Sequence, residues 1–161
     1  TMLGLSSVQG TSIQELISRN QRDSNIAFNA AETTIINAEG ILETLSATDW
    51  ESIVESAYAT SASPKVYNAE LSGVFLGNTG YPADSDYANS LSASLSNVAT
   101  QPVYFIEFLG TVTTDEDRLN IDNIGQNPNT CCTQMFRITA RGAGGTNSAV
   151  AIVQSTYGKR F

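Results

Sequence analysis

Apolar side chains recur at helical spacing through the first third of the chain. From Phe28 onward they fall at alternating steps of three and four residues, which places them on one narrow face of an α-helix. The members of this apolar stripe are Phe28, Ala31, Ile35, Ala38, Leu42 and Leu45. Pro64 is the first proline, and few glycines precede it, so little interrupts a helix. We therefore expect one long helix over residues 11–45, with the apolar stripe packed on the rest of the domain.

The N-terminal part of this predicted helix carries an apolar cluster of its own. Ile13, Leu16 and Ile17 return to helical spacing, whereas the stretch 18–25 (SRNQRDSN) has no apolar residue. A helix over residues 11–45 is about 50 Å long, which is more than a domain of this size can cover. We expect the part before Phe28 to project into solvent or against a partner.

Charged residues on the projecting part are further candidates for partner contacts. The full candidate interface is Ile13, Glu15, Leu16, Ile17, Arg19, Arg22 and Asp23. A simpler interpretation of the charged members is a solvated helix, because Glu15 with Arg19 and Arg19 with Asp23 form i,i+4 pairs worth about 0.3 kcal/mol each. Both interpretations stay open at this point.

The remainder of the chain has the alternation of strands. The strongest candidate is 102–112 (PVYFIEFLGTV), and a hairpin follows in which 134–141 and 148–157 flank a glycine-rich turn. Ile138 and Ile152 are expected in the core. Weaker signals predict a strand within 66–76 and short helices near 50–58, after a capping box at 48–51, and over 87–98. A helix followed by an antiparallel sheet is an α+β order, with the helix in residues 1–47 and a head in 48–161.

Glu107 lies inside the strongest predicted strand. Counting alternation with Tyr104 and Ile106 inward places Glu107 on the outer face. There a structural pair with Arg137 or Arg141 is favoured over a catalytic role.

Composition excludes several classes of function. The chain has 161 residues, of which 41% are hydrophobic and 15% charged, so it is expected to fold rather than to be disordered. A net charge of −8 disfavours nucleic acid as a partner. The absence of histidine removes the commonest general base and most zinc sites. We expect no catalytic residues, no cofactor and no metal.

The acidic segment 115–122 is the strongest candidate for a metal site. Its carboxylates are Asp115, Glu116, Asp117 and Asp122. They could gather calcium, but the D-x-D-x-D-G spacing is absent, so a solvated loop is the favoured interpretation.

The two cysteines, Cys131 and Cys132, are adjacent and cannot join distant segments. Three states are open: a strained vicinal ring, two buried thiols, or bonds to another chain.

Three segments together resemble the minor pilin PilX family of type IVa pili. LGLSSVQGTS is similar to the end of a pilin transmembrane helix, RNQRDSNIAFNAAE resembles the N-terminal helix motif of the family, and FRITARGAGGTNSAVAIVQSTY resembles its C-terminal hairpin. The resemblance implies a type IV pilin-like fold, in which a long N-terminal helix packs on a C-terminal antiparallel sheet. Many pilins close a C-terminal loop with a disulfide, which adjacent cysteines do not provide.

The resemblance also implies a function and a location. It implies a minor pilin that primes pilus assembly, is held in the inner membrane with a periplasmic head, and enters the extracellular pilus at or near the tip. The implied partners are PilV-, PilW- and FimU-like minor pilins, a PilY-family tip adhesin and the major pilin. Because the chain opens on threonine rather than methionine, we expect a preceding membrane segment. Two alternatives stay open: a type II secretion pseudopilin, and a surface module whose segments 77–86 and 113–130 bind a ligand, with Tyr81 and Tyr87 stacking on sugars.

Overall fold

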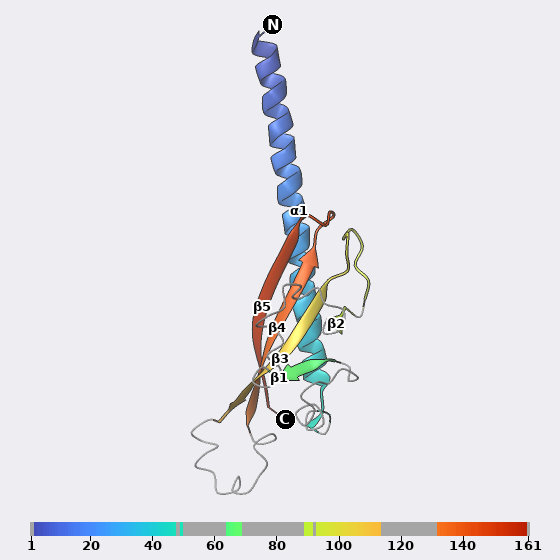
Figure 1. The fold of residues 1–161 in the computed structure, drawn as a ribbon, viewed down its shortest axis with the longest axis vertical. Helices are drawn as coiled ribbons and strands as arrows, with labels where there is room; N and C mark the ends of the chain where they lie inside the picture. Colours follow the sequence, from blue (N-terminus) through green and yellow to red (C-terminus); the bar gives the residue numbers. More distant parts are fainter. Residues whose placement is uncertain are drawn as a thin grey trace, which may run out of the picture.

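A long helix lies across one face of a β-sheet and extends well beyond it (Figure 1). The computed structural model describes residues 2–47, 49, 64–68, 89–91, 93–113 and 132–160, with side chains from residue 12 onward. Its elements in chain order are α1 (Met2–Thr44), β1 (Val66–Asn68), β2 (Asn89–Ser90), β3 (Val103–Val112), β4 (Thr133–Ala143) and β5 (Val150–Arg160). This arrangement confirms the predicted α+β, pilin-like class. None of the described helical stretches is apolar and long enough to cross a bilayer.

The sheet is mixed rather than wholly antiparallel. Its order is β1-β3-β4-β5, and β2 also pairs with β3. The neighbours β3, β4 and β5 are antiparallel as predicted, whereas β1 runs parallel to β3. A parallel neighbour needs a long connection, and the chain between β1 and β3 is long enough to supply one.

The core lies between α1 and the sheet. Ala31, Ile35, Ala38 and Leu42 are buried against Tyr104, Ile106, Phe136 and Ile138, with Leu45 partly buried at the margin. The prediction was wrong for Phe28, which is 46% exposed, while the neighbouring Ala27 is buried.

Close backbone contact explains this difference. A Cβ atom on Gly142 would lie 2.3 Å from the carbonyl oxygen of Ala27 and 2.6 Å from the nitrogen of Ala31. Helix and strand are therefore too close at this level for a phenylalanine between them. Alanine fits, and Phe28 is turned aside by one helical position.

The prediction for the last strand had its faces inverted. Ile152 is 56% exposed, whereas Val153 and Tyr157 pack against the core. The register decides this, because Val153 is opposite Ala140 and Ile152 is opposite Arg141. Ala140 and Ile138 are buried on the helix side of β4, so the strand residue beside Ala140 must face the helix as well.

Glu107 forms the predicted pair with Arg137 but is not exposed. Its two carboxylate oxygens accept hydrogen bonds from Nε and Nη2 of Arg137 at 2.6 and 2.9 Å, and the residue is only 2% exposed. Phe105, two residues earlier on the same face, is buried too. The outer face of β3 is thus covered, and the bidentate pair supplies the cation that a buried carboxylate needs.

The predicted helix over 87–98 was wrong for its described residues. Asn89 and Ser90 form β2, and the segment after them is irregular. The Asn89 side chain bonds both backbone groups of Lys65, at 2.8 and 2.9 Å, and the Gln101 side chain bonds the backbone of Leu95. Side chains that bond backbone in this way compete with helix formation.

Polar side chains form hydrogen bonds at the C-terminal end of α1 and just beyond it. Lys159 Nζ donates to the carbonyl oxygens of Leu42, Glu43 and Leu45 at 2.9, 2.6 and 2.7 Å. Just beyond the helix, the Ser46 hydroxyl oxygen accepts from the Asp49 N–H at 3.2 Å. In return the Asp49 carboxylate accepts from the Ser46 N–H at 3.4 Å and from the Ser46 hydroxyl at 2.6 Å. This reciprocal pattern is a capping box two residues earlier than the predicted one. Residues 48, 50 and 51 of the predicted box lie outside the described residues.

Cys132 is buried and disulfide-bonded. The alternative of two buried thiols is therefore wrong. Cys131, the other cysteine of the sequence, lies outside the described residues.

Candidate partner-binding surfaces

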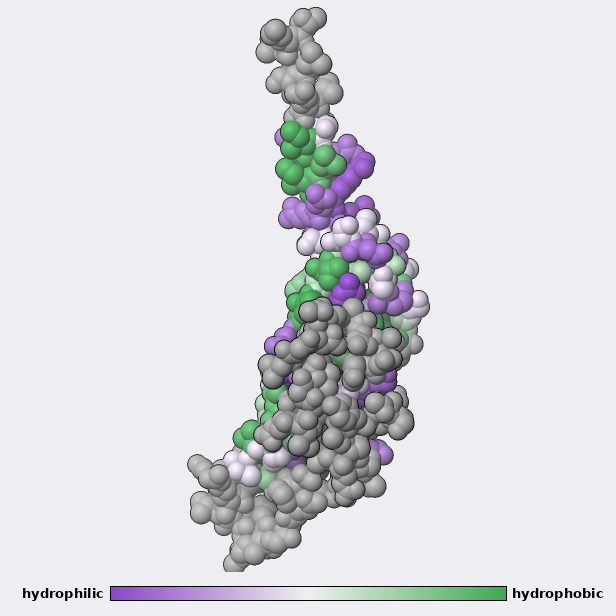
Figure 2. All heavy atoms as spheres, viewed as in Figure 1, coloured by the Kyte–Doolittle hydropathy of each residue, from purple (hydrophilic) through white to green (hydrophobic). Residues whose placement is uncertain are grey.

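The projecting part of α1 carries an uncovered apolar surface. Ile13, Leu16 and Ile17 are 57, 57 and 59% exposed, and we refer to these three residues as the N-terminal apolar cluster. Figure 2 shows hydrophobic atoms gathered on this part of the helix, above a band of polar residues. Such a cluster on a helix surface is typical of a partner site.

This cluster lies in line with the part of α1 that faces the sheet. Five turns of about 3.6 residues separate Ile13 from the buried Ala31, so their side chains leave the helix in the same direction. Leu16 and Ile17 flank that direction on either side. Two apolar parts therefore lie in line on the same side of the helix: the sheet covers the C-terminal one, and the N-terminal one is exposed.

The charged candidates on the projecting part fall into two groups. Glu15 and Arg19 form an i,i+4 ion pair with side chains 61 and 72% exposed, and Arg22 is exposed nearby. An exposed pair of this kind contributes about 0.3 kcal/mol, so it neither orders the helix nor prevents these groups from meeting a partner.

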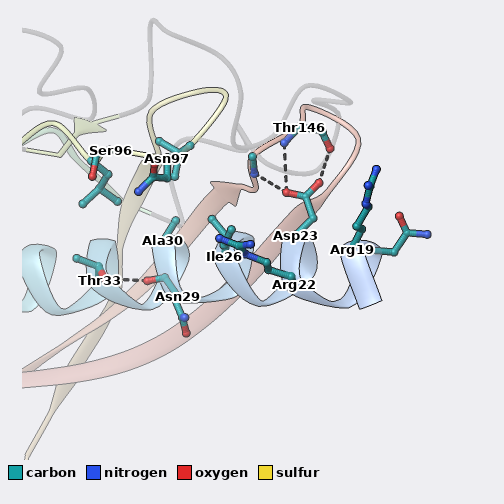
Figure 3. A pocket seen from close by; sticks show the side chains of 14 residues that line it. Arg19, Arg22, Asp23, Ile26, Asn29, Ala30, Thr33, Ser96, Asn97 and Thr146 are labelled. Atoms are coloured by element: carbon teal, nitrogen blue, oxygen red, sulfur yellow. Dashed lines mark hydrogen bonds between the residues drawn. The ribbon is translucent and has the colours of Figure 1, made fainter. Parts of the chain in front are cut away.

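Asp23 belongs to the second group, because it is bound within the chain. Its carboxylate accepts hydrogen bonds from the backbone N–H groups of Gly145 and Thr146 and from the Thr146 hydroxyl, in the turn between β4 and β5 (Figure 3). The side-chain hydrogen bond from Thr146 is the main cause of the lowered pKa of Asp23. Burial opposes it, and the backbone N–H groups of Gly145 and Thr146 lower the pKa further. Asp23 therefore attaches the hairpin to the helix, and its contact with a partner stays a prediction.

The glycines of this turn are part of the same contact. A Cβ on Gly144 would lie 2.4 Å from Asp23 Oδ1, and the N–H of Gly144 donates to the carbonyl of Ala149 at 2.8 Å. The sequence predicts residues 142–147 only as a glycine-rich turn. A glycine run and an acidic helix residue are both visible in the sequence, but nothing in the sequence shows that the two lie side by side and form this contact.

An open groove of about 1080 Å³ runs between α1 and the segment 95–98 (Figure 3). Ile26, Leu95 and Val98 are its half-buried apolar part, and Arg19 and Arg22 line one end. Asp23 and Thr146 lie in its wall. The groove thus adjoins the polar band of the projecting helix, but its charges of both signs define no particular ligand.

Other candidate sites fall outside what can be located. The acidic segment 115–122, the tyrosines Tyr81 and Tyr87, and residues 77–86 and 114–130 are not among the described residues. Within the described ranges, no three carboxylate or thiol side chains lie together as a metal ion would require.

Comparison with protein families gives two matches that together span the chain. The family described as Type IV pilus assembly protein PilX C-term matches residues 20–159, and the family described as PilX N-terminal matches residues 1–35. Searches of curated proteins and of solved structures returned no match.

Proposed function

The chain belongs to the family of the type IV pilus assembly protein PilX, and from this premise we propose that it is a minor pilin that primes pilus assembly and enters the pilus at or near its tip. In this role residues 1–47 provide helix contacts within the assembly, and residues 48–161 form the head. The protein acts by binding its neighbours and not by catalysis. The family match favours a pilus protein over the alternative of a secretion pseudopilin.

One observation carries this proposal: the N-terminal apolar cluster continues the sheet-facing side of α1 past the end of the sheet. Full burial of an isoleucine or leucine side chain is worth about 1.5–3 kcal/mol, so helices of neighbouring subunits that cover the cluster gain a substantial part of their binding free energy there. The polar band of residues 18–25 separates the two apolar halves of the helix. This polar band stays hydrated while the N-terminal apolar cluster contacts the helices of neighbouring subunits.

The partners proposed for this surface are pilus components. They are PilV-, PilW- and FimU-like minor pilins, the major pilin and a PilY-family tip adhesin. Before assembly the protein resides at the inner membrane with its head in the periplasm, and afterwards in the extracellular pilus. A ligand-binding role of residues 77–86 and 113–130 stays a prediction.

The test separates assembly from stability. Changing Leu16 and Ile17 together to Ser should leave the melting temperature of the 161-residue chain nearly unchanged, because both side chains are already exposed. In cells the same change should reduce pilus number and the co-purification of minor pilins. Ile36→Ser is the matched control, since it removes an exposed isoleucine from the same helix beside the head.

Two results would contradict the proposal. Normal piliation with the double variant would place the partner surface elsewhere, and unfolding of the chain would place Leu16 and Ile17 in a core. Loss of pili with Ile36→Ser to the same extent would remove the special role of the cluster.

A further inference from the structure

The last strand, β5, is an edge strand of the sheet. β5 is 11 residues long and is the terminal strand in the order β1-β3-β4-β5. Figure 1 shows it as the outermost strand on the side away from β1. Among the described strands, none pairs with its outer edge.

The backbone groups that face this edge belong to the even-numbered residues. The N–H of Gly144 donates to the carbonyl of Ala149, the residue just before β5. The backbone of this odd-numbered residue therefore faces β4. In an antiparallel pair bonded and non-bonded positions alternate, and the register of β4 with β5 continues without a shift. The N–H and C=O groups of Val150, Ile152, Gln154, Thr156 and Gly158 therefore point away from β4.

This edge lacks the features that usually protect an edge strand. It contains no proline, its pairing has no bulge, and its first charged residue is Lys159 near the end. Two of its exposed residues, Val150 and Ile152, are apolar and are 42 and 56% exposed. Natural sheets seldom leave so long and regular an edge without a partner.

The two sides of the edge differ in charge. On the helix side, Glu39 accepts a hydrogen bond from Ser155 at 3.0 Å and Glu43 accepts one from the Tyr157 hydroxyl, which places an acidic row of α1 next to β5. Glu32 lies about two turns before Glu39 and about three turns before Glu43, so it is on the same side of the helix, and it is exposed. On the outer side, Ile152 is the cross-strand neighbour of the half-buried Arg141.

We propose that the outer edge of β5 accepts an extended segment of a partner protein as an added strand. The partner's alternate side chains carry lysine or arginine where they point to the acidic row of α1. The side chains between them are apolar or acidic, where they meet Val150, Ile152 and Arg141. Backbone hydrogen bonds supply affinity, and the charge difference between the two sides fixes which face of the incoming strand is turned to the helix. This inference goes beyond the proposed pilus function and does not depend on it.

A synthetic peptide tests the proposal on the full 161-residue chain. The probe is a nine-residue peptide in which lysine alternates with valine and glutamate, and the control peptide has the same composition with the lysines grouped at one end. NMR titration of the isotope-labelled chain should show saturable shifts confined to β5 and α1 residues near it, with slower amide exchange at the even-numbered β5 positions. The control peptide should bind about tenfold more weakly, although its net charge is the same.

Three variants make the result specific. Thr156→Pro removes an N–H that faces the edge and leaves the bonds to β4, so it should weaken probe binding by about tenfold or more, whereas Thr156→Ala should bind within about twofold of the parent. Glu32 is exposed, so Glu32→Lys should leave the fold intact; it should weaken binding of the lysine probe several-fold while strengthening binding of a probe with glutamate in place of lysine. It keeps the test valid if Thr156→Pro fails to fold.

The proposal is overturned if both peptides bind equally, if the shifts map away from β5, or if the probe shows no saturable binding. Unchanged affinity in Glu32→Lys for both probes would likewise exclude the charge-selected strand.

Discussion

Lys159 on β5 donates a hydrogen bond to the carbonyl oxygen of Leu42 on α1, at 2.9 Å, and so a strand residue closes the C-terminal end of the helix. Its ammonium group also reaches the carbonyls of Glu43 and Leu45. These carbonyl groups lie at or just beyond the last turn of the helix, where i+4 N–H donors run out; the Leu42 carbonyl also accepts from the Leu45 N–H at 3.2 Å. The negative end of the helix dipole favours a cation there. The contact links the last strand to the helix that begins the chain.

Replacing this lysine should destabilise the protein. Lys159→Met keeps the length of the side chain but removes the donor, and we expect the free energy of unfolding to fall by about 1–3 kcal/mol, as for a hydrogen bond to a charged group. Urea denaturation monitored by circular dichroism measures this change. Arg22→Met, which removes an exposed cation from α1, should stay within about 0.5 kcal/mol of the parent. Equal effects of the two substitutions would show that net charge, and not the helix end, is responsible.

Asp23 makes part of the stability depend on pH. Its pKa in the folded chain lies below its ordinary value of 3.8, chiefly because the Thr146 hydroxyl donates to the carboxylate. The stabilisation is therefore complete above pH 3.8 and is lost as pH falls through the lower folded-state pKa. Asp23→Asn should reduce the difference between the urea midpoints at pH 7 and pH 3, whereas Glu15→Gln should not. A difference unchanged by Asp23→Asn would mean that the hairpin contact does not stabilise the carboxylate.

Two glycine-to-alanine changes should have opposite signs. Gly142→Ala places a methyl group 2.3 Å from the Ala27 carbonyl oxygen, so helix and strand must separate, and a loss of about 1–3 kcal/mol is expected. Gly40→Ala meets no atom within 4 Å in the exposed part of α1 and should stabilise by about 0.5–1 kcal/mol through helix propensity. The melting temperatures of the two variants and of the parent, measured by thermal unfolding, test the opposite signs. Stabilisation by Gly142→Ala would show that the helix and β4 are not in close contact.

The extent of the elements could be predicted because their signals are local. A helix free of proline to beyond its end and strands rich in aromatic and β-branched residues are visible in any short window of the sequence. The strands β3, β4 and β5 formed near their predicted positions, and α1 ends at Thr44, next to its predicted end at residue 45. The helix begins at Met2, before the predicted start at residue 11. The exposure of the N-terminal apolar cluster could be predicted as well, because counting residues shows that the helix is longer than the head can cover. The strand predicted within 66–76 is confirmed over Val66–Asn68, and residues 69–76 lie outside the described residues. The segment 87–98 was less predictable, because the Asn89 side chain took backbone partners far away in the chain.

What tertiary structure alone decided is which of two neighbouring residues faces inward. The alternation of β5 predicts two faces but does not say which one meets the helix. Because Val153 pairs with the buried Ala140, the face of Val153 meets the helix and Ile152 is exposed. On α1 the sequence predicted an apolar stripe through Phe28, and the approach of Gly142 selected Ala27 instead. Asp23 became a hairpin contact for the same reason, because the turn that holds Thr146 arrives beside it only when the sheet is complete. Periodicity is a property of one segment, whereas register and the distance between helix and sheet are set by two segments far apart in the chain, and those contacts exist only in the folded molecule.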